Sequence, residues 1–211
     1  MEDFIIQTPV ASIIFLTTIM VSLLTFSNTT LYGKLMLHPY SVSRGNKLYT
    51  IITSGFIHRD WMHLFMNMLS YYFFAFQLER ILVMASNWGH IQFGMLYLVS
   101  LILSDMGSII RHKDHFWYHS LGASGAVCAV VFSYILFYPL ASMLILPIPI
   151  PIPAVLYGIL FLAYCMYATK SANDNINHEA HFLGALAGML ITIILYPHII
   201  RHFITQLTSG L

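Results

Sequence analysis

A serine flanked by glycines stands where a polar loop changes into a long apolar stretch. The segment Gly122-Ala123-Ser124-Gly125 follows a loop rich in histidine, and no charged residue appears after it until Lys170. The first N–H groups of a helix have no partner within the helix, so the Ser124 amide is able to face an anion. Serine is also a preferred N-cap residue, which explains so short a motif without any chemistry. A nucleophilic role for Ser124 therefore depends on what the rest of the chain supplies.

A base for that serine is available in the last apolar stretch, which opens with His181 and continues through Gly184 and Gly188. These three residues share one side of a helix. Gly184 and Gly188 form a strip of small residues that permits close contact with another membrane helix, and the stretch that begins at Gly125 is the natural partner. Such glycines often only mediate packing. Here the same contact would also bring the His181 ring within reach of Ser124, which needs a base to become a nucleophile.

A second histidine and an asparagine supply hydrogen-bond donors. His63 and Asn67 are four residues apart at the start of an apolar stretch, so they lie on one face of a helix. Together with the Ser124 N–H, their side chains are able to hold the oxyanion of a tetrahedral intermediate. A polar pair that only links two helices by hydrogen bonds is the competing interpretation.

The composition requires a membrane around these residues. Of 211 residues, 58% are hydrophobic and only 8% are charged, with a mean hydropathy of +0.76. Soluble domains carry about 25% charged residues, so the chain is predicted to be an integral membrane protein, and its length suits one domain over residues 1–211. A net charge of +1 gives no electrostatic basis for binding nucleic acid. Two cysteines in apolar stretches exclude a disulfide framework and a four-cysteine zinc site.

The apolar stretches predict an all-α membrane protein with six transmembrane helices. Their approximate ranges are 10–26, 61–78, 91–104, 122–146, 154–169 and 180–200. The proline-rich run 147–153 cannot be α-helical and separates two of them. The long connection 27–60 is apolar enough to lie partly in the membrane interface. The acidic Met1-Glu2-Asp3 lacks the charge of a signal peptide, so the first helix is predicted to be retained.

Because the helices alternate in direction, the second, fourth and sixth must begin on the same side of the membrane. Their first turns contain His63, Ser124 and His181. Polar groups within membrane helices are costly and count as functional by default. Three such residues at similar depth are therefore predicted to form one site.

At this point the sequence resembles the rhomboid family of intramembrane serine proteases. The matching motifs are His63-x-x-x-Asn67, Gly122-x-Ser124-Gly125 and Ala180-His181-x-x-Gly184-x-x-x-Gly188, in that order. The resemblance covers about residues 45–190 and implies a six-helix rhomboid-like bundle. Each motif is loose, but their ordered combination is specific.

The resemblance implies a Ser–His dyad with no required acidic member. Ser124 would attack the peptide carbonyl, and His181 would act first as general base and then as general acid. His63, Asn67 and the Ser124 amide would form the oxyanion hole, with Gly122 allowing close backbone approach. The implied partners are the lipid bilayer and transmembrane protein substrates that enter laterally, and neither a cofactor nor a metal is implied. Some members carry a tyrosine stacked on the histidine where this chain has Cys128, so the His181 ring must rest on other packing.

Two other functions compete with this interpretation. His178-Glu179-Ala180-His181 superficially resembles a zinc protease motif, but a zincin helix needs its two histidines at i and i+4 rather than i and i+3. Rhomboid-like pseudoproteases bind membrane helices without cutting them, but they typically lack the serine or the histidine that is present here. Three histidines in the third connection could suggest a metal, but a solvated loop near the rim of the site is the better explanation: His112, His115 and His119.

The chain is expected to be a multi-pass protein of the plasma membrane or a bacterial inner membrane. The family orientation, with the site facing away from the cytoplasm, disagrees with the positive-inside rule. In that orientation the cytoplasmic side holds Arg80 and Arg201. The opposite side holds seven basic residues: Lys34, Arg44, Lys47, Arg59, Arg111, Lys113 and Lys170.

Overall fold

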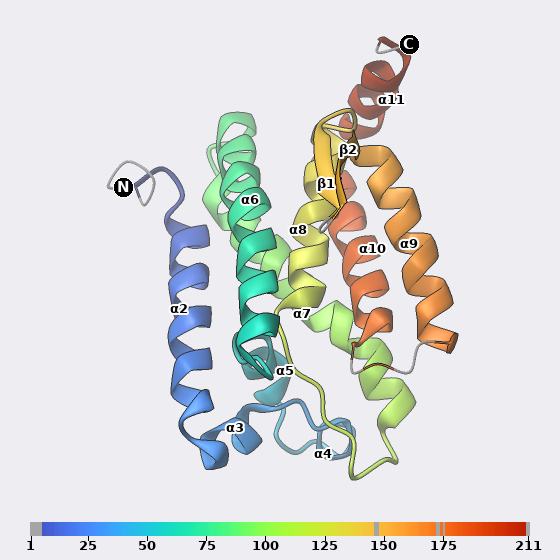
Figure 1. Cartoon of the computed structure of the whole chain (residues 1–211). Helices are drawn as coiled ribbons and strands as arrows, with labels where there is room; N and C mark the ends of the chain where they lie inside the picture. Colours follow the sequence, from blue (N-terminus) through green and yellow to red (C-terminus); the bar gives the residue numbers. More distant parts are fainter. Residues whose placement is uncertain (1–5, 146–147, 172–173, 175, 210–211) are drawn as a thin grey trace.

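The short helix α8 (Ser124–Phe137) is the central element of the computed structural model, which describes residues 6–145, 148–171, 174 and 176–209. Most of its side chains are buried among three longer helices. These are α6 (Trp61–Ala85), α7 (Gly89–His112) and α10 (His178–Leu195), which surround α8 in Figure 1. Its residues are uncharged and largely small or aliphatic, which is the pattern of a helix buried on every side.

Two further helices lie at the outside of this group. The helix α2 (Pro9–Phe26) packs on α6 and α7, and α9 (Ala154–Ser171) packs on α10 and α8 (Figure 1). Within the described residues, four helices are long and apolar enough to cross a membrane, namely α2, α7, α9 and α10. The chain is therefore a mostly helical, multi-pass integral membrane protein. The predicted count of six crossings goes beyond this criterion, because α8 has only 14 residues and α6, although 25 residues long, is not among the four.

The predicted fourth helix, 122–146, is wrong at its C-terminal end, because α8 is shorter. The helix α8 stops at Phe137 because Pro139 follows, and the residue before a proline avoids helical backbone. Tyr138 accordingly has φ −133° and ψ 69°. The chain then forms an antiparallel hairpin of β1 (Ser142–Ile145) and β2 (Ile148–Pro153), which the sequence had marked only as non-helical.

The second and third helices continue past their predicted ends at 78 and 104. Glu79 is fully buried within the last two turns of α6, where its carboxylate accepts hydrogen bonds from the backbone N–H groups of Val10 (3.2 Å) and Ala11 (2.7 Å). His90 pairs with the same carboxylate at 2.6 Å. Asp105 is likewise buried within α7 rather than at its end. Both carboxylates have partners in the fold, so neither ends a helix.

The sixth helix, predicted as 180–200, is two elements. The helix α10 begins at His178, where the Asn177 side chain caps it by accepting from the Ala180 N–H at 3.0 Å. It ends at Leu195, two residues before Pro197, and α11 (Ile199–Ser209) follows. The proline again explains why the apolar stretch does not continue as one helix.

The long first connection folds into four short helical turns at one end of the bundle (Figure 1). Their bounds are α3 (Thr29–Leu35), α4 (Pro39–Val42), α5 (Thr50–Thr53) and the 3-10 turn η1 (Ser54–Phe56). The turns α4 and α5 pack on α7, and η1 packs on α2, so the connection is part of the fold.

Candidate active site

The structure places the three predicted chemical residues at the starts of three neighbouring helices. Ser124 is the first residue of α8, His63 is the third of α6 and His181 is the fourth of α10. All three side chains are partly buried. The start of α6 is fixed by Asp60, whose carboxylate accepts a hydrogen bond from the His63 N–H at 2.8 Å.

The His63 ring and the Ser124 hydroxyl both lie close to Gly122. A β-carbon added to Gly122 would lie 2.8 Å from His63 Cε1, 3.0 Å from His63 Nε2 and 3.9 Å from Ser124 Oγ. Ring and hydroxyl therefore face one point beside the glycine. The backbone of Gly122 has φ +118°, which disfavours any other residue type. Its N–H donates to the Ser54 carbonyl at 2.9 Å, which fixes the turn that leads into α8.

The helices that carry Ser124 and His181 touch through their backbones. A β-carbon on Gly184 would lie 2.7 Å from the carbonyl carbon of Gly125, and one on Gly188 would lie 2.6 Å from that of Ala129. Real β-carbons are essentially never found this close to backbone, so only glycine fits at these positions of α10. These contacts place the second and third turns of α10 against the first two turns of α8.

The predicted pair of Ser124 and His181 is not hydrogen-bonded in this structure. Neither Ser124 Oγ nor the His181 ring forms a hydrogen bond with any residue that the structure describes. Catalytic hydrogen bonds are often long in unliganded sites and tighten only when substrate binds. The Ser–His pair therefore stays a prediction.

The His181 ring is supported by an aromatic residue that the sequence did not single out. Phe161 of α9 stacks on it, with ring centroids 6.3 Å apart and planes at 25°. The His178 ring meets it edge-on at 6.1 Å. Phe161 thus supplies the aromatic contact that is absent at Cys128. In the sequence, nothing distinguishes Phe161 from the other aliphatic and aromatic residues of α9.

The hydrogen bonds of His63 and Asn67 show which N–H groups of their side chains are free to donate to a ligand. The Arg59 N–H donates to His63 Nδ1 at 3.4 Å, and a neutral ring that accepts at Nδ1 carries its proton on Nε2. That nitrogen is the one beside Gly122. Asn67 is buried and donates one side-chain N–H to the His63 carbonyl at 2.9 Å, which leaves its second N–H available.

A further histidine, His58, lies next to His63. It is fully buried, its Nδ1 hydrogen-bonds with Ser22 Oγ at 2.9 Å, and its ring meets that of His63 edge-on at 4.9 Å. Burial and the neighbouring His63 lower the pKa of His58 to about 3, so it is neutral at physiological pH.

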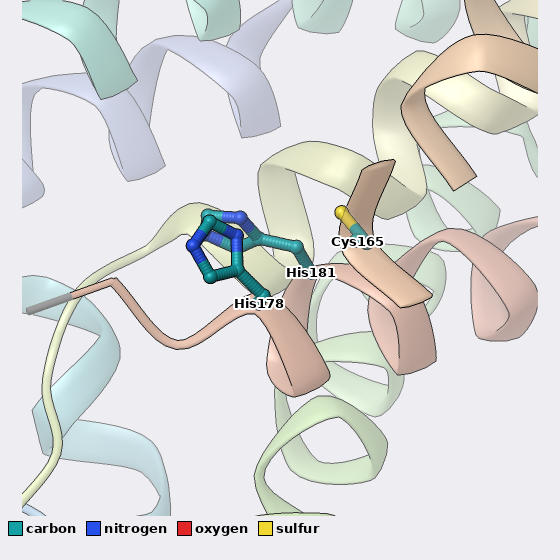
Figure 2. Close-up of side chains that lie close together, drawn as sticks. All are labelled: Cys165, His178 and His181. Carbon is teal, nitrogen blue, oxygen red and sulfur yellow. The ribbon is translucent and has the colours of Figure 1, made fainter. Parts of the chain in front are cut away.

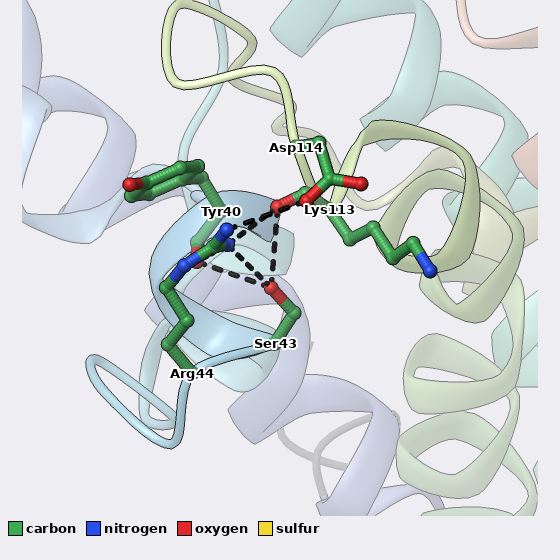
Figure 3. Close-up of polar contacts among 5 residues, drawn as sticks. All are labelled: Tyr40, Ser43, Arg44, Lys113 and Asp114. Atoms are coloured by element: carbon green, nitrogen blue, oxygen red, sulfur yellow. Dashed lines mark hydrogen bonds and ion pairs between the residues drawn. The ribbon is translucent and has the colours of Figure 1, made fainter.

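The connection between α2 and α6 is hydrogen-bonded to the loop that leads from α7 to Ser124. Leu37 and Ser120 exchange two backbone hydrogen bonds of 2.9 and 3.1 Å. Figure 3 shows a second link, in which Arg44 donates to the Lys113 carbonyl at 2.7 Å and pairs with Asp114 at 3.3 Å. The same guanidinium lies 3.7 Å from the ring centroid of Tyr40. Two connections far apart in sequence are thereby joined.

One group of three side chains in the described part of the chain is arranged so that it could hold a metal ion. It consists of Cys165, His178 and His181, whose ligand atoms lie within 4.8 Å of one another (Figure 2). The histidines of the third connection are arranged differently. His112 and His115 are joined to each other through their Nδ1 atoms at 3.0 Å, and His119 stacks on His38.

Comparisons with known proteins point to one family. The family model described as "Rhomboid domain" matches residues 45–198, which is more than half of the chain. The chain is 32% identical over 169 residues to "RHOMBOID-like protein 12, mitochondrial" of Arabidopsis thaliana, covering 71% of this chain and 48% of the relative. It is 29% identical over 151 residues to "Rhomboid protein 1, mitochondrial" of Saccharomyces cerevisiae, covering 67% and 40%.

A bacterial relative is closer to this chain in length. YdcA of Bacillus subtilis, whose name contains the words rhomboid protease, is 28% identical over 144 residues, covering 68% of this chain and 65% of the relative. By contrast, the chain spans half or less of the plant and yeast proteins. The matched range holds every predicted site residue, from His63 to Gly188, and the helices that position them. The chain belongs to the rhomboid family.

Proposed function

We propose that this chain is an intramembrane serine endopeptidase that cuts transmembrane segments of other membrane proteins. One observation carries the proposal: the partly exposed Ser124 hydroxyl, without a described hydrogen-bond partner, shares the point beside Gly122 with His63. Its helix is at the same time in backbone contact with the helix of His181. A serine that only capped a helix would need neither arrangement.

In the proposed reaction, Ser124 Oγ attacks the peptide carbonyl carbon while its proton passes to His181. The carbonyl oxygen becomes an oxyanion held by the Ser124 N–H, the Nε2–H of His63 and the free N–H of Asn67. The C–N bond then breaks, and the His181 imidazolium gives its proton to the leaving amine. A water molecule, deprotonated by His181, attacks the acyl-enzyme, and the proton returns to Ser124 as the second product leaves.

The proposed substrate follows from the surroundings of the site. It lies at helix starts in a protein whose outer surface carries many exposed apolar side chains, including those of α2 and α9. A substrate that reaches it from the bilayer is itself a membrane segment, and its backbone must unwind before Ser124 can attack. The three rhomboid relatives support the reaction class. Two of them are named as mitochondrial, so the plasma or bacterial inner membrane stays a prediction for this chain.

The test is cleavage by the purified protein in proteoliposomes with a panel of tagged single-span substrates. We expect wild type to produce fragments and Ser124→Ala to produce none. Ser142→Ala, in the exposed start of β1, is the matched serine control and should cleave as wild type does. Capture of uncut substrate by both wild type and Ser124→Ala, with no fragments, would favour a helix-binding pseudoprotease instead.

A further inference from the structure

The group of Cys165, His178 and His181 joins the proposed general base to two residues that the reaction does not use. Cys165 comes from α9, and both histidines come from the first turn of α10 (Figure 2). Their ligand atoms lie within 4.8 Å of one another. The i, i+3 spacing of the histidines does not fit a zincin helix, but a third ligand from a neighbouring helix removes the need for that spacing.

His178 is held in the manner of a metal ligand. Its Nε2 faces both carboxylate oxygens of Asp174, at 3.1 and 3.2 Å. Its side chain is only 4% exposed, and its Nδ1 is a buried nitrogen with no hydrogen-bond partner among the described residues. A buried polar atom without a partner is costly and calls for an explanation. A carboxylate that holds one ring nitrogen while the other is left free is the usual arrangement around a metal-bound histidine.

The donor set selects the class of metal. One thiolate and two imidazoles suit Zn²⁺, with the fourth tetrahedral position open to water. The edges of such a site are about 3.3–3.8 Å for ordinary Zn–N and Zn–S lengths. The three ligand atoms therefore need to approach one another by about 1 Å, a movement that side-chain rotation can supply.

We propose that Cys165, His178 and His181 form a zinc site that switches off the proposed protease by occupying its general base. Binding displaces the Cys165 thiol proton to solvent and uses the single lone pair of each neutral imidazole. His181 then has a metal on one nitrogen and a proton on the other. Neither nitrogen can accept the Ser124 proton. The inhibitory role rests on the proposed function, whereas metal binding does not.

Metal binding is tested without any substrate. Metal-free protein in detergent is titrated with Co²⁺, a spectroscopic substitute for Zn²⁺, and the thiolate-to-cobalt charge-transfer band is recorded. Wild type should give the band, and Zn²⁺ should bleach it. Cys165→Ser should abolish it, while Cys128→Ser, which changes the only other cysteine, should leave it. Asp174→Asn, an exposed change that spares the core, should weaken cobalt binding about tenfold to a hundredfold.

Inhibition is tested on cleavage by the same variants. At a free Zn²⁺ concentration about ten times the dissociation constant, wild-type cleavage should fall about tenfold by mass action, and EDTA should restore it. Cys165→Ser should cleave equally well with and without Zn²⁺. The proposal is overturned if wild type gives no cobalt band, if the band survives in Cys165→Ser, or if zinc slows that variant as much as wild type. A cysteine-dependent band in a protein that cuts no substrate would instead reject the proposed function and leave the metal site standing.

Discussion

Gly184 of α10 lies directly against the backbone of Gly125 of α8, so close that a methyl group on Gly184 would be 2.7 Å from the Gly125 carbonyl carbon. Ser124 immediately precedes one of these residues, and His181 precedes the other by three positions. The backbone contact therefore sets the separation between the proposed nucleophile and its base.

Replacing Gly184 by alanine should push α8 and α10 apart. The added methyl group meets backbone rather than a flexible side chain, so a loss of about 1–3 kcal/mol in unfolding free energy is expected. Cleavage per folded molecule should fall as well, because the dyad is stretched. Thermal midpoint and specific activity are measured together. Gly33→Ala, on α3 with open space around its α-carbon, is the matched control and should lower neither. Normal turnover by folded Gly184→Ala would show that this contact does not assemble the dyad.

Asn67→Ala should lower kcat more than it raises KM, because the lost donor acts on the transition state. Removal of one oxyanion donor typically costs about 10²–10³ in rate, and the remaining donors, His63 and the Ser124 amide, could reduce the loss to about tenfold. Steady-state kinetics on a tagged substrate give both constants. Asn46→Ala, in an exposed loop, serves as the control. Unchanged turnover in both Asn67→Ala and His63→Ala would make this pair structural only.

Phe161 is expected to position His181 through its stacked ring. Phe161→Leu keeps much of the apolar volume but loses the flat surface, so kcat should fall about tenfold to a hundredfold with little change in thermal midpoint. Phe161→Tyr retains the ring and should restore most of the activity. If both variants lose activity only in proportion to lost folded protein, Phe161 is a packing residue and nothing more.

Burial of His58 predicts an acid-sensitive fold. Its pKa is lowered to about 3 from the usual 6.5, so the folded state favours the neutral ring. The contribution of His58 to stability is complete above pH 6.5 and is lost as the pH falls from there toward 3. The thermal midpoint of wild type should therefore drop between about pH 7.5 and about pH 5. In His58→Gln, which cannot titrate, the drop should be smaller. An equal drop in both proteins would exclude His58 as its source.

The site residues could be predicted because each is a polar exception in an apolar stretch. His63, Ser124 and His181 stood out at helix starts, and alternation of the helices was enough to expect them on one side. Phe161 and Cys165 are ordinary in an apolar sequence, so only the packing of α9 on α10 reveals their nearness to His181.

The helix ends were harder to predict for two physical reasons. Glu79 looked like the end of a helix, yet its partners are backbone N–H groups of α2, 68 and 69 residues away in sequence. Local sequence cannot show such a pairing. Pro139, by contrast, is a helix-stop signal in the sequence, but the prediction gave more weight to the long uncharged stretch around it. The predicted helix 122–146 therefore ran past this proline.

Labelling of the purified protein by a mechanism-based serine reagent tests the central claim most directly. The reagent is a fluorophosphonate. It should modify one residue, identified by peptide mass spectrometry as Ser124, because only a serine with a neighbouring base is activated toward it. Labelling should vanish in Ser124→Ala, should fall sharply in His181→Ala and should persist in Ser142→Ala. Labelling that remains in Ser124→Ala, or that is equally strong in folded His181→Ala, would contradict the Ser124–His181 dyad.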